Sequence, residues 1–116
     1  MTDLILEEDC GGQCVGCIKT RRMVSAVVTG TLNHLVGWLD EGDLERSGRA
    51  AARFLNIIAK APESTRELVG IDNMSQLATA VGDGLSKIRR GDAGAASIAI
   101  RVGLMNWYET YPPYRA

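Results

Sequence analysis

Two short segments of similar sequence, 49 positions apart, constrain the fold of this 116-residue chain more than any other feature. They are Glu41-Gly42-Asp43 and Arg90-Gly91-Asp92, and each follows a stretch with helical periodicity. A glycine in the left-handed conformation closes a helix, and an aspartate directly after it can cap the next helix. Each segment therefore predicts a corner inside a helical hairpin, and we expect a positive φ angle at Gly42.

Apolar residues recur at every third or fourth position on both sides of these corners, which predicts helices with one buried face each. The first helix is expected from about residue 19 to residue 39, the second after the first corner, and the third before the second corner. Between the second and third helices, Ser64-Thr-Arg-Glu67 has the form of a capping box that begins a short helix, and Gly70 would close it. Asn73, with Gln76 three positions on, or Asp72 alone can cap the third helix. The expected core positions are Val24, Val28, Leu32, Leu35, Leu39; Leu44, Gly48, Ala51, Leu55, Ile58; Met74, Leu77, Val81, Leu85 and Ile88.

The last helix, from about residue 93 to residue 108, differs from the others because it is apolar nearly all round. Such a helix is either central in a bundle or presents a second face to a partner. Since a small bundle can bury one face, we expect the other to bind another chain, together with the aromatic residues at the chain end. One face carries Ala95, Ala99, Val102 and Met105. The residues expected to bind a partner are Ile100, Leu104, Trp107, Tyr108, Tyr111 and Tyr114.

These patterns predict an all-α fold, a small bundle of about four helices arranged as two hairpins. Residues 1–18 form a cysteine- and glycine-rich segment that we expect to be a loop, and residues 19–110 form the bundle. Residues 111–116 contain Pro112 and Pro113, so we expect an extended tail there. The length corresponds to a single folded domain.

The N-terminal segment contains all three cysteines of the chain, Cys10, Cys14 and Cys17. Thiolates on a glycine-rich loop can bind zinc or an iron-sulfur cluster, although a closed zinc site needs four ligands. The only histidine, His34, lies too far along the first helix to share an ion with Cys17. Two other interpretations stay open: disulfides within or between chains, or burial of the cysteines as small apolar residues.

Composition narrows the class of function. The chain has 13 basic and 14 acidic side chains, which argues against a protein held to nucleic acid mainly by its charge. It has no apolar run long enough to cross a bilayer, and its first residues are acidic where a classical secretion signal is basic. We therefore expect a soluble protein, cytoplasmic or within a larger particle, that does not bind membranes.

No group of residues in the sequence has the pattern of a catalytic site, because the carboxylates stand singly and only one histidine is present. The sequence favours a non-catalytic structural or adaptor subunit of a larger protein assembly, for example a virion or a multisubunit complex, acting as a homo- or hetero-oligomer without a cofactor. The alternative is a small metal- or iron-sulfur-binding accessory or redox protein that uses Cys10, Cys14 and Cys17.

Overall fold

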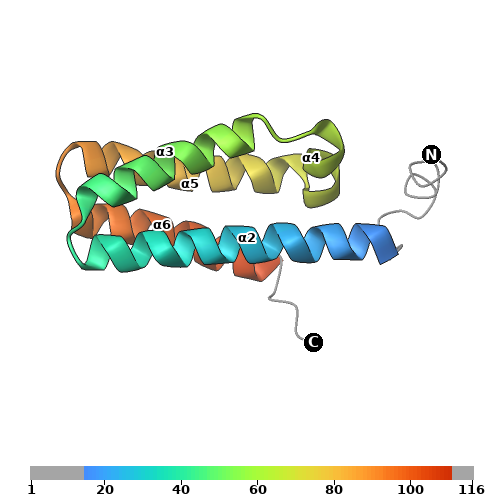
Figure 1. Ribbon diagram of the computed structural model, residues 1–116, viewed down its shortest axis with the longest axis horizontal. Coiled ribbons are helices and arrows are strands. Elements are labelled where there is room, and N and C mark those ends of the chain that lie inside the picture. The colour runs from blue at the N-terminus through green and yellow to red at the C-terminus, as the bar shows by residue number, and fades with distance from the viewer. Residues whose placement is uncertain (1–14, 111–116) are drawn as a thin grey trace.

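The computed structural model describes residues 15–110, and within this range the fold is all-α, as predicted (Figure 1). Within these residues it contains five helices, whereas the predicted bundle had about four; the fifth is the short helix that the sequence also predicted between the second and third long ones. α2 and α6 lie side by side in one layer, and α3 and α5 form the other layer, with α5 packed most extensively on α6. The helices are α2 (Val15–Asp40), α3 (Leu44–Ala59), α4 (Glu63–Val69), α5 (Ile71–Arg89) and α6 (Ala93–Thr110).

Both predicted corners are confirmed and have the same backbone geometry. Gly42 has φ +79° and its N–H donates to the Leu39 carbonyl at 3.0 Å. The Asp43 N–H donates to the Trp38 carbonyl at 2.9 Å, which completes a Schellman motif. The Asp43 carboxylate then caps α3 by accepting from the Arg46 N–H at 3.0 Å. In the second corner Gly91 has φ +81° and its N–H donates to the Ile88 carbonyl. The Asp92 N–H donates to the Lys87 carbonyl, and the Asp92 carboxylate accepts from the Ala95 N–H.

The core lies between the two layers and contains most of the expected residues. The predicted stripes of α2 and α5 are buried, apart from Val24 and Met74 at their ends, which are partly buried. In α3 the predicted face was rotated from the observed one: Ser47, Ala51 and Phe54 are buried, whereas the expected Leu44, Gly48, Leu55 and Ile58 are partly buried. Of the expected residues of α3, Ala51 alone is fully buried.

The face of α6 that enters the core is the one that we expected to bind a partner. Ile100, Leu104 and Trp107 are buried within the chain's own bundle, so this part of the prediction was wrong. The reason is a close approach of α5 to α6. A Cβ atom on Gly103 would lie 2.5 Å from the Ala80 Cβ of α5. Since glycine at this position lets the two backbones approach, the residues of α6 that flank it face inward.

Two buried or half-buried hydrogen bonds fix the long helices against each other. The Trp107 indole N–H donates to the Ser25 hydroxyl at 3.4 Å, so the polar atom of this core residue is satisfied. At the other end of α6, the Ser97 hydroxyl donates to the Asp40 carboxylate at 3.0 Å. Together these contacts set α2 and α6 antiparallel, with the C-terminal end of α2 beside the N-terminal part of α6.

α4 is held to the end of α3 by Arg66, whose guanidinium donates to the carbonyls of Ile58, Ala59 and Ala61. These carbonyls lie at or just beyond the C-terminal end of α3, where no further helical turn supplies backbone donors; the Ile58 carbonyl also accepts from the Ala61 N–H at 3.2 Å. The predicted capping box is not formed, since α4 begins at Glu63, and Ser64 lies inside the helix.

The start of α5 also differs from the sequence-based expectation. Asn73 was expected to cap this helix, but its side-chain amide donates back to the Val69 carbonyl at 2.8 Å. Gly70, with φ +104°, ends α4 and lets α5 begin at the next residue.

Candidate protein-binding surface

α6 carries three large apolar side chains on the side opposite the core. Ile98, Val102 and Met105 are 65%, 50% and 65% exposed. They are spaced by four and three residues, so they form one continuous stripe along the helix. A stripe of this kind on a helix that is already packed on its other side is an unusual surface for an isolated bundle.

The neighbouring helix α2 also exposes apolar side chains. Met23 and Val27, one turn apart, are 69% and 57% exposed. α2 also carries small residues at its surface, among them Gly30 and Gly37, and a Cβ atom on either glycine would meet no atom of residues 15–110 within 4 Å. We call the surface formed by Met23, Val27, Gly30, Gly37, Ile98, Val102 and Met105 the outer face of α2 and α6.

The outer face is almost free of charge. Residues 23–39 of α2 include no Asp, Glu, Lys or Arg, and residues 93–108 of α6 include only Arg101. The Arg101 guanidinium is paired within the chain: it donates to the Asp40 carboxylate at 2.6 Å and to the Ser97 hydroxyl at 3.1 Å. The contact between α2 and α6 therefore contains an ion pair without net charge instead of an isolated charge.

The opposite layer has a different surface. The solvent side of α3 carries Glu45, Arg46, Arg49, Arg53 and Lys60, all exposed. Arg46 also lies 5.6 Å from the centre of the Trp38 ring, on which His34 stacks at 5.7 Å. The charges of the described chain are thus unevenly distributed, and the uncharged side coincides with the exposed apolar stripe.

A second apolar surface is the groove between the end of α3, α4 and the start of α5, with a volume of about 260 Å³. Exposed Ile71 and half-buried Met74 line it, and Arg66 lies at its edge. Because the Arg66 guanidinium is already occupied by the α3 carbonyls, the groove presents few polar groups that could orient a ligand.

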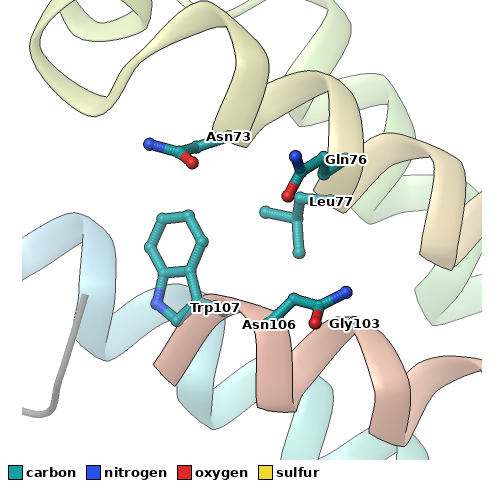
Figure 2. A pocket seen from close by; sticks show the side chains of 6 residues that line it. All are labelled: Asn73, Gln76, Leu77, Gly103, Asn106 and Trp107. Carbon is teal, nitrogen blue, oxygen red and sulfur yellow. The ribbon is translucent and has the colours of Figure 1, made fainter. Parts of the chain in front are cut away.

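A smaller pocket lies between α5 and α6, and Figure 2 shows three side-chain amides around it, from Asn73, Gln76 and Asn106. The edge of the Trp107 ring and Leu77 form its apolar wall. Its volume of about 10 Å³ is the space of roughly one water molecule. The pocket is therefore too small for an organic substrate.

Of the three cysteines predicted to bind a metal or form disulfides, only one lies among the residues that the structure describes. Cys10 and Cys14 lie outside the described residues, whereas Cys17 belongs to α2, which begins at Val15 instead of near residue 19. His34 lies 17 residues further along the same continuous helix, about 25 Å by helical rise, so the two residues cannot share an ion within one chain. Within residues 15–110, no three His, Cys, Asp or Glu side chains are grouped closely enough to hold a metal ion.

The remaining residues predicted to bind a partner are the tyrosines at the chain end. Tyr108 is half-buried and packs against the core of its own bundle. Tyr111 and Tyr114 lie outside the described residues. Among the helices between residues 15 and 110, none combines the length and apolar character needed to cross a membrane.

The exposed stripe on α6 was not predicted, because the other of the two apolar faces of this helix was expected to bind a partner. The two corners carried the missing signal, because shifting the chain by their separation of 49 positions aligns Ile100 with Ala51, an expected core residue that is buried, and Val102 with the charged Arg53. This alignment favours Ile100 as a core residue and leaves Val102 at the surface.

Comparisons of the chain with protein-family models, with curated proteins and with solved structures found no match.

Proposed function

We propose that this chain is a non-catalytic structural or adaptor subunit that binds another protein chain through the outer face of α2 and α6. The observation that carries the proposal is the stripe of Ile98, Val102 and Met105, which is exposed although the opposite side of the same helix fills the core. Continuous exposed apolar surface of this kind marks protein–protein contacts more often than it marks a free surface.

Covering the outer face would provide a substantial part of a binding free energy. Burying a large apolar side chain completely stabilises by about 1.5 to 3 kcal/mol, and the five apolar side chains of this face are half to two-thirds exposed. Each can therefore contribute about 1 to 2 kcal/mol when a partner covers it. The paired Arg101 and Asp40 lower the cost of bringing the face against another chain, because no isolated charge has to be desolvated.

Affinity capture with matched variants tests this proposal. The wild-type chain, Val102→Lys and Ile57→Lys are immobilised and exposed to an extract of the native source. Ile57 is 56% exposed on α3, away from the outer face, and therefore provides the control. We expect Val102→Lys to lose polypeptides that wild type and Ile57→Lys retain. Equal retention by all three would show that the outer face is not a binding surface.

A further inference from the structure

We propose that the chain that covers the outer face is a second copy of this protein, in a symmetric dimer with its two-fold axis parallel to the helices. The inference rests on the proposed function, because it names the occupant of the same surface. In this arrangement α6 of each protomer packs over α2 of the other. Such an interface is self-complementary, as two-fold symmetry requires.

The outer face has a ridge of large side chains on α6 and, at matching spacing on α2, a row with a glycine at each end, which we call the groove. The ridge on α6 consists of Ile98, Val102 and Met105, and the groove on α2 runs past Gly37, Asn33 and Gly30. Ile98 and Met105 are seven residues apart, as are Gly30 and Gly37, so both elements extend over about 10.5 Å. Counted from Ile98 to Met105 on α6 and from Gly37 to Gly30 on α2, both rows have an interval of four residues followed by one of three.

The register within one protomer supports this pairing. The bonds Ser97–Asp40 and Trp107–Ser25 fix α6 antiparallel to α2. They place the ridge at the same height along the bundle as residues 30–37. A two-fold axis parallel to the helices keeps these heights and directions unchanged. It therefore sets the ridge of one copy against the groove of the other. In the related packing class of antiparallel helices, ridges of residues three apart on one helix fit into grooves between residues four apart on the other.

The charges also favour a second copy. The central part of the face has no net charge, because Arg101 is neutralised by Asp40 of the same chain. Two copies can meet there without like charges facing each other. At one end of the face, α2 carries exposed Lys19 and α6 carries exposed Glu109. The proposed symmetry brings α2 of one copy against α6 of the other. Lys19 of one copy is thus brought toward Glu109 of the other, and these charges are of opposite sign.

The available area is of the size that a stable dimer needs. The 18 residues of α6 span about 27 Å, and two helices side by side are about 20 Å wide, which gives a projected face of about 540 Å². Standard protein interfaces bury about 800 Å² per partner, measured on the corrugated accessible surface. The projected and accessible areas are therefore of the same order.

The test is the mass of the full-length chain by sedimentation equilibrium between about 1 µM and 1 mM. A reductant is present throughout, so that disulfides among the cysteines cannot contribute. We expect a species of twice the 12.5 kDa chain mass that dissociates on dilution. A monomer at every concentration would overturn the inference. The proposed function would stand in that case if Val102→Lys still abolished capture of other proteins.

Two variants test which face forms the dimer. Val102→Lys changes the ridge, and Gly37→Leu fills the groove; we expect each to raise the dissociation constant at least about tenfold. Because no described residue lies within 4 Å of a Cβ atom on Gly37, this variant should not lower the melting temperature of the monomer. The controls Ile57→Lys on α3 and Thr79→Leu on α5 are at exposed sites away from the face and should dimerise as wild type does. Unchanged dimerisation of both Val102→Lys and Gly37→Leu would show that another surface forms the dimer and would overturn the inference.

Discussion

The close approach of α5 to α6 makes a sharp prediction for Gly103→Ala. The added Cβ would lie 2.5 Å from the Ala80 Cβ, whereas carbon atoms in contact are normally 3.5 to 4.0 Å apart. Neither atom can rotate away, because both are fixed to helix backbones, so α5 and α6 must separate by about 1 Å. Overpacking of this kind costs about 1 to 3 kcal/mol. The gain in helix propensity offsets about 1 kcal/mol of it.

A matched control separates these two effects. Gly82→Ala, on α5, gains the same helix propensity, but its Cβ meets no atom within 4 Å in the part of the chain that the structure describes. By urea denaturation, we expect Gly103→Ala to be less stable than Gly82→Ala by about 1 to 3 kcal/mol. In a domain of this size, each kcal/mol corresponds to roughly 4 to 8 °C in Tm.

The partner residue provides the decisive comparison. Among residues 15–110, outside the backbone of α6 itself, the Ala80 Cβ is the one atom within 4 Å of the added Cβ, so Gly103→Ala should have no overpacking cost in an Ala80→Gly background. There it should change stability as Gly82→Ala does. Equal effects of Gly103→Ala in both backgrounds would refute the proposed packing of α5 on α6.

Three further predictions concern the corners, the core and α4. Replacing Gly42, which has φ +79°, with alanine should cost about 1 to 2 kcal/mol, measured by thermal denaturation; an unchanged Tm would contradict the corner geometry. Leu35→Ala should cost about 2 to 5 kcal/mol because Leu35 is fully buried, and Leu55→Ala should cost clearly less because Leu55 is half-buried; equal losses in chemical denaturation would contradict this. Arg66→Lys should lose about 1 to 3 kcal/mol despite its retained charge, since an ammonium cannot reproduce the fork of donors to three carbonyls; wild-type stability would contradict that role.

The helices and corners of this fold follow from local sequence, and the choice between faces of α6 does not. Gly42 and Gly91 each end a periodic segment and precede an aspartate, so both turns could be predicted from a few neighbouring residues. For α6, both sides are apolar, and periodicity alone cannot select which one is buried. The selection depends on the contact of Gly103 with Ala80, which joins residues far apart in the chain.

The errors at the helix starts have a similar origin. The capping box at Ser64 and the cap at Asn73 have suitable sequences, but α4 begins at Glu63 and α5 at Ile71, so both residues lie inside their helices. Arg66 donates to the last carbonyls of α3, and Asn73 donates back to Val69. Gly16 did not prevent α2 from starting at Val15, because a glycine in the first turn costs less than one in the helix interior.

The most direct test of the central claim, that protein covers the outer face of α2 and α6, uses two methionines already in it. Met23 and Met105 are both largely exposed in the single chain, whereas Met74, near the start of α5, is half-buried in the groove beside α3 and α4, away from the face. The measurement is the rate of their oxidation by dilute hydrogen peroxide, followed by peptide mass spectrometry, at low and high protein concentration. The account predicts that Met23 and Met105 become protected together as the dimer forms, while the rate at Met74 stays constant. Oxidation of Met23 and Met105 at the same rate at every concentration would contradict it.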